Sequence, residues 1–428
     1  MELKKYKLAD IAKIEISGVD KKTIEGETPV RLCNFVDVYY NWAVTKEKAK
    51  AFMTASAKQT EIDKCSIGKG MVAITKDSET RDDIGIATYI ADDFEDVLLG
   101  YHCALITPNP AIVDGKYLNA FMHTRYIQKY FENNASGSGQ RYTLSNDTIS
   151  NIPVLLPSIE EQHTIGKLLA DLDRKIELNK QINDNLEAMA KQLYDYWFVQ
   201  FDFPNEEGKP YKSSGGAMVW NEKLKREIPE GWYAENICKI ANILSGGTPS
   251  KAVDEYWNNG TIPFFGPTDC NGSVFQIKTA DHITQKGLEH CASSLFEEGI
   301  VIITARGSIG KLVIVGTPMA MNQSCYALQS KEGEYEYLYF LTTQLIDCLK
   351  AKGSGSVFKS IIASDIEHST LCIATDNVVS DFCKKVKPMF EKLKANTIEI
   401  AELTKQRDEL LPLLMNGQAS INYHLSDD

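Results

Sequence analysis

The segment Gly307–Lys311 reads GSIGK, a glycine-rich turn that ends in a lysine. Backbone N–H groups in such turns can bind phosphate. A nucleotide-binding phosphate loop needs four residues between its first glycine and the Gly-Lys pair, and a serine or threonine after the lysine. Here the spacing is shorter and Leu312 follows, which argues against nucleotide binding. With Arg306 before it, the turn fits two hypotheses equally: contact with a DNA backbone or base edge, or a plain solvated hairpin.

A second glycine turn, SGGTPS, contains Gly246, Gly247 and Thr248, and Lys251 follows it. Two adjacent glycines permit a close approach of the backbone to a phosphate. They equally suit a turn at the end of a strand. We favour the structural interpretation slightly.

Polar aromatic residues gather in the first part of the chain, at Tyr39, Tyr40, Asn41 and Trp42, and Arg141 follows a flexible GSGQ segment. Such residues can stack on or hydrogen-bond to bases, but aromatic residues at this density are more often part of a core. Both interpretations stay open.

Known catalytic patterns are missing from the sequence. It contains no Pro-Pro dipeptide, which adenine methyltransferases of the usual kind carry after an Asn or Asp, and no HExxH or GxSxG motif. No two of the ten cysteines have the close spacing of paired zinc ligands. We therefore expect no catalytic residue and no metal site, and we expect free, mostly buried thiols in a reducing compartment.

Length and charge limit the architecture. A chain of 428 residues suits two domains. The net charge of −12 argues against nucleic-acid binding by bulk electrostatics, so any DNA groove must be local or partly supplied by partners. The sequence has no apolar signal-peptide core and no run long enough to cross a bilayer. We expect a cytoplasmic protein without membrane contact.

The sequence repeats itself. GKGMVAIT (68–75), a segment around Cys103 and a helical run from Lys116 to Phe131 recur in the same order as EEGIVIIT (297–304), a segment around Cys325 and a helical run from Tyr335 to Lys350. Each half then reaches a GSG (137–139 and 353–355), an apolar strand-like run and a long helix. The order indicates a tandem duplication of one globular unit and one helix.

Each long helix carries an apolar seam with the 3.5-residue spacing of a coiled coil. The first seam runs from Ile165 to Trp197 with interruptions at Asn179 and Asn183, and the second runs from Val379 to Leu414 with interruptions at Asn396 and Arg407. We expect buried asparagines there to fix the register. Pro388 suggests that the regular part of the second helix begins only near that residue.

One seam in one chain would suit a dimerisation zipper, but two seams in one chain favour an intramolecular pair. We expect helices over Ser158–Phe201 and Asp376–Met415 to pack antiparallel. This pairing would relate the two units by a pseudo-twofold axis.

Within each globular unit, β-branched runs lie beside amphipathic helical stretches, so the predicted fold class is α/β. The segment from Asp202 to Gly231 is rich in Gly, Ser, Pro and charge and predicts an exposed connection. The expected divisions are a first domain (1–157), a central helix (158–202), a linker with a second domain (203–373), and a distal helix with a C-terminal tail (374–428).

Four segments carry a family resemblance: IPVLLPSIEEQ (152–162), QLYDYWFVQFDFP (192–204), GWYAENICKIANILSGGTPS (231–250) with YWNNGTIPFF, and QRDELLPLLMNGQ (406–418). In this order, and across essentially the whole chain, they resemble the specificity subunits of type I restriction-modification enzymes. The first domain departs from the pattern, because it has EISGVDKK where the second has SGGTPS.

The resemblance implies two target-recognition domains that each read one half of a split double-stranded DNA site, and a helix pair that fixes the spacer. It also implies that the helices hold two methyltransferase subunits, to which restriction and translocase subunits can add. S-adenosylmethionine, ATP and Mg²⁺ would serve those partners, and this chain would bind none of them. The alternatives are a self-sufficient DNA methyltransferase or nuclease, and a structural coiled-coil adaptor.

The candidate DNA-binding residues are polar, cationic or glycine residues at expected loops. They are Tyr39, Tyr40, Asn41, Lys76, Arg141, Gly246, Gly247, Thr248, Lys251, Arg306 and Lys311.

Overall fold

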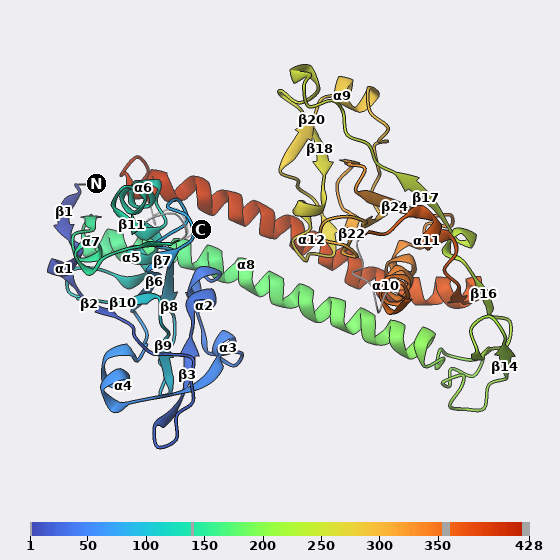
Figure 1. The fold of residues 1–428 in the computed structure, drawn as a ribbon, viewed down its shortest axis with the longest axis horizontal. Helices are drawn as coiled ribbons and strands as arrows, with labels where there is room; N and C mark the ends of the chain where they lie inside the picture. The colour runs from blue at the N-terminus through green and yellow to red at the C-terminus, as the bar shows by residue number, and fades with distance from the viewer. Residues whose placement is uncertain (1, 138–140, 353–359, 422–428) are drawn as a thin grey trace, which may run out of the picture. The chain divides into compact units, whose positions relative to one another are not determined.

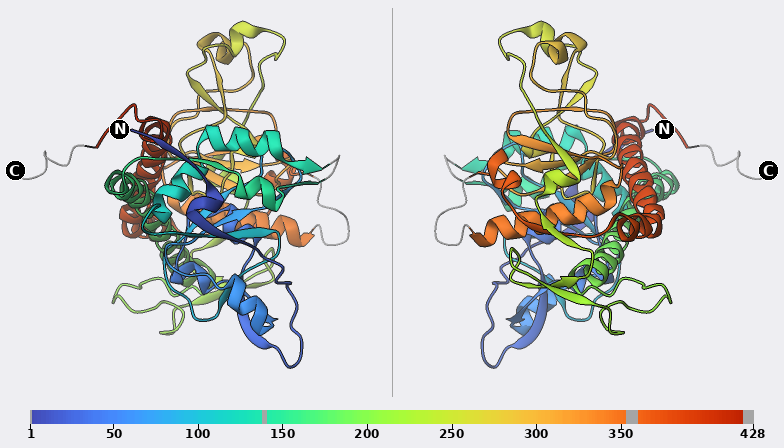
Figure 2. Two further views of the ribbon diagram at one scale, coloured as in Figure 1. Left: turned by 90° about the vertical axis from the view of Figure 1, so that its left-hand side faces the viewer. Right: turned by 90° about the vertical axis from the view of Figure 1, so that its right-hand side faces the viewer.

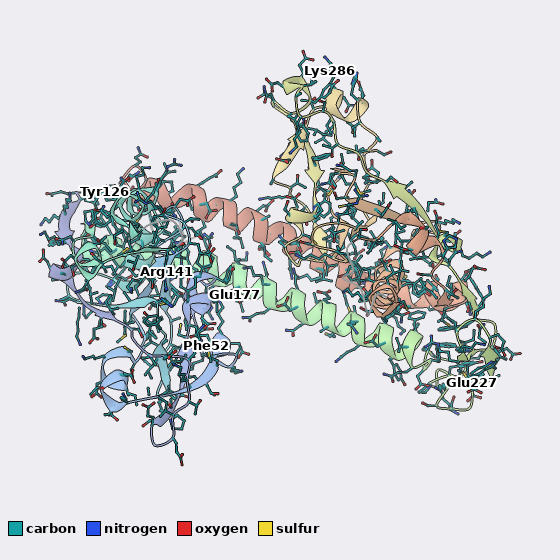
Figure 3. All side chains as sticks on the ribbon, in the orientation of Figure 1. Phe52, Tyr126, Arg141, Glu177, Glu227 and Lys286 are labelled. Carbon is teal, nitrogen blue, oxygen red and sulfur yellow. The ribbon has the colours of Figure 1, made fainter. Side chains whose placement is uncertain are left out.

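The computed structural model describes residues 2–137, 141–352 and 360–421. Residues 1–176 and those from 402 onward form one compact unit, and residues 177–401 form the other. Glu177, labelled in Figure 3, marks the start of the second unit within a long helix.

The first unit is built on a five-stranded sheet with the strand order β2-β10-β6-β8-β4. Neighbouring strands are antiparallel except β8 and β4, which are parallel. A second sheet has the order β5-β3-β9, and β1 pairs with β13. Strands β6, β8 and β9 are buried along their whole length, in keeping with their mostly apolar sequences. The strands are β1 (Lys4–Lys7), β2 (Ala12–Ile16), β3 (Thr28–Cys33), β4 (Ala43–Val44), β5 (Met53–Ala57), β6 (Val72–Thr75), β8 (Ala87–Ile90), β9 (Val97–Leu99), β10 (Cys103–Pro108) and β13 (Pro153–Leu156).

The second unit repeats this topology strand for strand. Its five-stranded sheet has the order β17-β24-β21-β22-β19, again with a single parallel pair at the β22–β19 edge. The sheet β20-β18-β23 and the pair β16–β25 complete the match, which confirms the predicted tandem repeat. The strands are β16 (Tyr233–Glu235), β17 (Ala241–Ser245), β18 (Ile262–Phe265), β19 (Phe275–Gln276), β20 (Asp281–Ile283), β21 (Val301–Thr304), β22 (Leu312–Val315), β23 (Ala320–Met321), β24 (Cys325–Ser330) and β25 (Leu371–Ile373).

One helix of the repeat differs from the expectation. The helical run predicted over 116–131 is two helices, α5 (Gly115–Met122) and α6 (Arg125–Asn134). Thr124 caps α6, because its side chain accepts a hydrogen bond from the N–H of Ile127. The matching run of the second unit is a single helix, α10 (Tyr335–Lys352). Most of the two predicted GSG segments, 138–139 and 353–355, lies outside the described residues.

Shorter elements complete the two units. The short helices are α1 (Leu8–Ile11), α2 (Phe35–Tyr39), α3 (Lys46–Ala49), α4 (Gln59–Cys65), α7 (Asn146–Ser150), α9 (Gln285–Glu289) and α11 (Ala363–Glu367). A small sheet in the first unit has the order β11-β12-β7, with strands at Ser136–Gly137, Tyr142–Thr143 and Asp77–Ser78. The predicted connection after Asp202 contains one hairpin, formed by β14 (Met218–Asn221) and β15 (Arg226–Pro229).

The two long helices match their predicted ranges. Helix α8 (Ile159–Tyr194) continues as a π-helical turn over Asp195–Val199, and α12 spans Asp376–Met415. At the start of α8, Ser158 and Glu161 form reciprocal side-chain to backbone hydrogen bonds, which cap the helix. The suggestion that the regular part of the second helix begins near Pro388 is wrong. Pro388 is exposed within α12, where solvent can hydrate the carbonyl that a proline leaves without a partner.

The seams of α8 and α12 face each other in antiparallel fashion within the chain. In the second unit, Asn396 Nδ2 donates to Asn183 Oδ1 at 2.9 Å and Asn179 Nδ2 donates to Glu399 at 2.9 Å, so numbers that rise along α8 meet numbers that fall along α12. In the first unit, Nη1 of Arg407 on α12 lies 3.6 Å from Oδ1 of Asp173 on α8. The helices lie side by side in Figure 1 and end-on in Figure 2. The predicted intramolecular pair is confirmed.

The cysteines are free, as predicted, and seven of the ten are buried. Burial raises the pKa of the Cys103 thiol to about 12. No helix in the described part of the chain is long and apolar enough to cross a membrane.

Candidate nucleic-acid interface

In both domains, a threonine side chain closes the loop that follows the central strand of the five-stranded sheet. The Oγ1 of Thr75, at the end of β6, accepts a hydrogen bond at 3.0 Å from the N–H of Ile86. The Oγ1 of Thr304, at the end of β21, accepts one at 3.0 Å from the N–H of Lys311. The two loops that these threonines close therefore occupy equivalent places in the two sheets.

The residue after each threonine is bound to the turn that precedes β10 or β24. The N–H of Lys76 donates to the carbonyl of His102 at 2.8 Å, and that of Ala305 donates to Ser324 at 2.8 Å. His102 and Ser324 are thus equivalent positions. In each domain, the strand-end loop and this turn form one surface.

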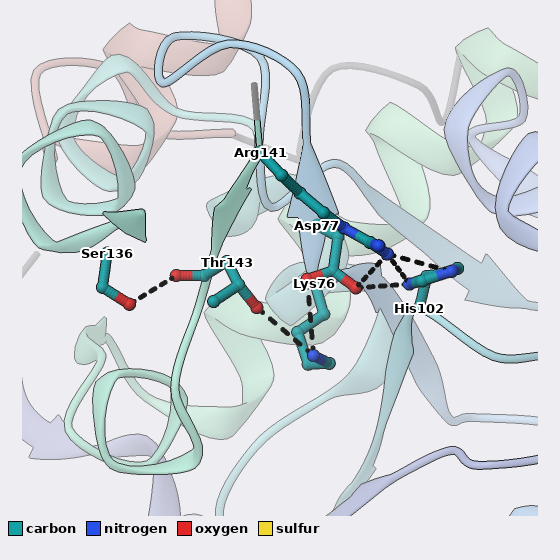
Figure 4. A network of polar contacts seen from close by, with 6 residues as sticks. All are labelled: Lys76, Asp77, His102, Ser136, Arg141 and Thr143. Atoms are coloured by element: carbon teal, nitrogen blue, oxygen red, sulfur yellow. Dashed lines mark hydrogen bonds and ion pairs between the residues drawn. The ribbon is translucent and has the colours of Figure 1, made fainter. Parts of the chain in front are cut away.

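In the first domain, this surface carries a cluster of polar side chains around Asp77 (Figure 4). The Asp77 carboxylate lies 2.5 Å from His102 Nδ1, 3.5 Å from Arg141 Nη2 and 3.4 Å from Lys76 Nζ. Lys76 also donates to Thr143 Oγ1 at 3.3 Å. The loop after β6, the turn before β10 and strand β12 each contribute to this cluster.

Asp77 is the centre of the cluster, with a side chain that is only 11% exposed. Burial favours the neutral acid, but hydrogen bonds from Thr143 and His102 and the charge of Lys76 outweigh it, so the pKa of Asp77 lies below its ordinary value. Asp77 is therefore a buried carboxylate held in its charged form. Arg141, by contrast, has a side chain that is 58% exposed.

Of the candidates Tyr39, Tyr40 and Asn41 in the first domain, one is exposed and two are hydrogen-bonded to other residues of the protein. Tyr40 is 78% exposed. Tyr39 donates to Asp83 at 2.7 Å, and this bond together with burial raises the pKa of Tyr39 to about 12. Asn41 donates to the carbonyl of Asp37 at 2.8 Å. Of these three candidates, Tyr40 alone has a largely free surface.

Trp42, the fourth residue of that aromatic group, packs against its own domain and against α12. Its ring stacks on His123 with centroids 4.3 Å apart, and the guanidinium of Arg407, on α12, lies 4.9 Å from the ring. Arg407, which interrupts the apolar seam, thus joins α12 to the first domain through a cation–π contact.

The two glycines of SGGTPS are required by close packing within the protein. A Cβ on Gly246 would lie 2.2 Å from the carbonyl oxygen of Asn322, and one on Gly247 would lie 2.7 Å from the backbone nitrogen of Ala292. This close approach is to the protein's own backbone, in line with the structural interpretation. The next residue, Thr248, is hydrogen-bonded to Gln323.

The cationic candidates of the second domain lie on its surface. GSIGK forms the turn between β21 and β22, and Gly307 and Gly310 have the positive φ values that favour glycine there. A strand follows the turn, whereas a phosphate loop leads into a helix, so the phosphate-loop alternative is excluded. Arg306 is exposed. Lys311 Nζ donates to the carbonyl of Cys270 at 3.3 Å, and Lys251 lies 5.7 Å from the ring of Trp257.

Sequence reasoning missed Asp77, His102, Thr143 and Gln323. Three of them pair with a residue that the sequence did single out: Asp77 with Arg141, Thr143 with Lys76, and Gln323 with Thr248. The usable signal was the repeat itself, because the equivalent loops of two aligned domains could have been searched for polar residues. Among the described residues, no group of three or more His, Cys, Asp or Glu side chains could hold a metal ion.

Comparison with known proteins agrees with this architecture. The family profile described as "Type I restriction modification DNA specificity domain" matches residues 1–188 and 229–375. The HindI type I restriction enzyme specificity subunit of Haemophilus influenzae is 25% identical over 80% of this chain and 85% of its own length. The MjaIX specificity subunit of Methanocaldococcus jannaschii is 28% identical over 74% of this chain and 71% of its own.

Among solved structures, the S subunit of a type I restriction-modification system from M. genitalium has the same fold. It superposes with a TM-score of 0.59 at 16% identity and covers 97% of this chain and 96% of its own. The family profile matches well over half of the chain, in one segment for each repeat. The chain therefore belongs to the type I restriction-modification DNA specificity family.

Proposed function

We propose that this chain is a sequence-specific DNA-binding specificity subunit that recognises a bipartite site, one half with each domain. The observation that carries the proposal is the duplication of one sheet topology, each copy followed by a long seam-bearing helix. Two similar readers on a fixed spacer suit a target with two half-sites on a periodic double helix. A structural adaptor would have no need of two such domains.

We assign the DNA contacts to the strand-end loops and their surroundings. The exposed candidates Tyr40, Arg141, Lys251, Arg306 and Lys311 are the proposed contact residues. Lys76, Tyr39, Asn41 and Thr248 already have protein partners and would hold the loops in shape, as would the two glycines. A few exposed cations on each domain would give it a local basic surface, and screening limits the effect of the net charge of −12 on that surface to a range of about 10 Å.

The chain would bind DNA and position its partner subunits, and those partners would catalyse methylation or cleavage. We propose that the helix pair, within 158–202 and 374–428, holds two methyltransferase subunits, and that restriction subunits add to this core. S-adenosylmethionine would be bound by the methyltransferase subunits, and ATP and Mg²⁺ would be used by the restriction subunits.

Reconstitution tests this proposal. The purified chain should neither methylate nor cut DNA, whereas the chain combined with a methyltransferase subunit from the same type of system should methylate a defined bipartite sequence. Methyl transfer by the chain alone would overturn the non-catalytic assignment. Methylation by the assembly with no sequence preference would overturn the recognition role.

A further inference from the structure

The cluster around Asp77 assigns a specific task to one exposed arginine. We infer that Arg141 reads a guanine in the half-site bound by the first domain, and that Asp77 and His102 position its guanidinium. This inference rests on the proposed function and deepens it. Arg141 is labelled in Figure 3, and its contacts are drawn in Figure 4.

The guanidinium is held at one end only. The polar contacts of Arg141 to the described residues all use Nη2, which lies 3.5 Å from Asp77 Oδ2 and within 3.0 Å of both ring nitrogens of His102. Nη2 carries two N–H groups, so the second of these and the neighbouring N–H of Nη1 are left to form a fork toward a ligand. An arginine fixed in this way presents a planar fork of N–H groups and loses less side-chain freedom on binding than an unsupported one.

The carboxylate decides which acceptor this fork suits. Asp77 is charged and lies 3.5 Å from Arg141, so it offsets part of the attraction that the arginine would have for a DNA phosphate. The O6 and N7 atoms of guanine are neutral acceptors, and their spacing in the major groove matches the arginine fork. A carboxylate-buttressed arginine therefore favours a guanine edge over the phosphate backbone.

The backbone at His102 is an independent observation. His102 has φ of 73°, a left-handed conformation that is unfavourable for residues other than glycine and is often found at functional sites. The conformation places the imidazole against both Asp77 and Arg141. The equivalent residue of the second domain, Ser324, is not in this conformation. The strained turn therefore accompanies the arginine cluster and is no requirement of the shared sheet.

Arg141→Ala and Arg141→Lys test the assignment in the full chain assembled with its methyltransferase subunits, on a library of random duplexes. For the unaltered chain, we expect one position of one half-site to be guanine. Both substitutions should reduce the preference for that guanine over the other bases by roughly 5- to 150-fold, the range that one bidentate contact supplies. The lysine variant keeps the positive charge, so it should still methylate DNA with a relaxed sequence.

Asp77→Asn tests the positioning role with a readout that a purely structural residue would not change. Removing the carboxylate should weaken the discrimination for guanine while strengthening binding to unrelated duplex DNA, because Arg141 then becomes free to contact phosphate. Arg125→Ala is the matched control. It removes another exposed arginine of the same domain, on α6, and should leave both half-sites unchanged.

The possible failures are distinguishable. If the unaltered assembly methylates no defined sequence, the proposed function fails. If it methylates a bipartite sequence and Arg141→Lys retains the full guanine preference, or if no invariant guanine occurs in either half-site, the guanine assignment alone is overturned.

Discussion

The turn after β2 in the first domain and the turn after β17 in the second stand at the same place in the fold but are built differently. Ile16 pairs with the residue that follows Cys103, and Ser245 pairs with the residue that follows Cys325. EISGVDKK and SGGTPS are therefore equivalent loops, although their sequences differ. Gly18 has open space around it, whereas Gly247 packs against backbone. The sheet fixes where the loop lies, and the loop residues are free to differ.

The same contrast extends to the surface formed in each domain by the loop after β6 or β21 and the turn before β10 or β24. In the first domain, buried Asp77 organises charged side chains, and in the second, two glycines pack closely against backbone. Two domains with one scaffold and different loops are what independent readers of two different half-sites require. Three sets of substitutions and one pair of insertions can break or sharpen this comparison.

The largest expected effect comes from adding a methyl group at the equivalent glycines. Gly247→Ala should lower the free energy of unfolding by about 3 kcal/mol, because the new Cβ would lie within 3.0 Å of three atoms of Ala292, two of them backbone. Gly18→Ala, the matched control, should change it by less than about 0.5 kcal/mol. Chemical unfolding of the full chain measures both, and equal losses would refute the structural difference between the loops.

The helix seams offer a second test. Asn179 and Asn396 each lie 23 residues after the last residue of the preceding strand, Leu156 and Ile373 (179 − 156 = 396 − 373). Asn396 is fully buried and donates to Asn183. Asn396→Ala should cost about 2 kcal/mol, because Asn183 Oδ1 loses its hydrogen bond while Asn183 Nδ2 keeps its bond to Thr397.

The double variant Asn183→Leu with Asn396→Leu should be nearly neutral, since both polar groups are removed together. Thermal unfolding of Asn183→Leu, Asn396→Leu and the double variant gives the coupling energy between the two side chains. Additive losses would show that the asparagines do not act as a pair.

The smallest predicted effect depends on pH and belongs to the first unit. Burial lowers the pKa of His123 to about 4, against a partly compensating hydrogen bond to the carbonyl of Ala87. In the unfolded chain His123 takes up a proton near pH 6.5, whereas in the folded chain it does so only near pH 4. The free energy of unfolding is therefore highest above pH 6.5 and decreases as the pH falls from 6.5 to about 4. The loss should be about 1 to 2 kcal/mol, because His123 is only partly buried.

His123→Gln should flatten this dependence in unfolding experiments between pH 4 and 7. A slope equal to that of the unaltered chain would assign the effect to other groups.

The duplication and the helix pair were predictable because periodic patterns encode them directly. The seam of α8 shows its 3.5-residue spacing in sequence, and Thr75 and Thr304 end matching apolar runs. The break between α5 and α6 was missed because the apolar pattern continues through it, and a single capping threonine, Thr124, decides where the second helix starts. The prediction at Pro388 was wrong for a related reason. The energetic cost of a proline within a helix depends on its exposure to solvent, which the sequence pattern does not show.

The candidate site was predictable only in part. Arg141 and Arg306 could be selected by charge and position, but their partners are far away in sequence. Asp77 lies 64 residues from Arg141, and they meet because β7 and β12 pair across a small sheet. The left-handed backbone of His102 was not predicted, because a histidine in the sequence does not by itself indicate that conformation. Trp42 was grouped with Tyr40 by sequence proximity, yet it contacts Arg407 from the opposite end of the chain.

The most direct test of the account is a change in the length of the helix pair. We would insert four residues after Glu177 in α8 and four after Ala401 in α12, two points that face each other in the antiparallel register. The insertions add about one helical turn, or about 6 Å, to each helix. At about 3.4 Å per base pair, this corresponds to one or two base pairs. If two independent readers sit on one spacer, methylation mapped on random DNA should show both half-sites unchanged and the spacer longer by that amount. An unchanged spacer, with the helices verified as extended, would contradict the account.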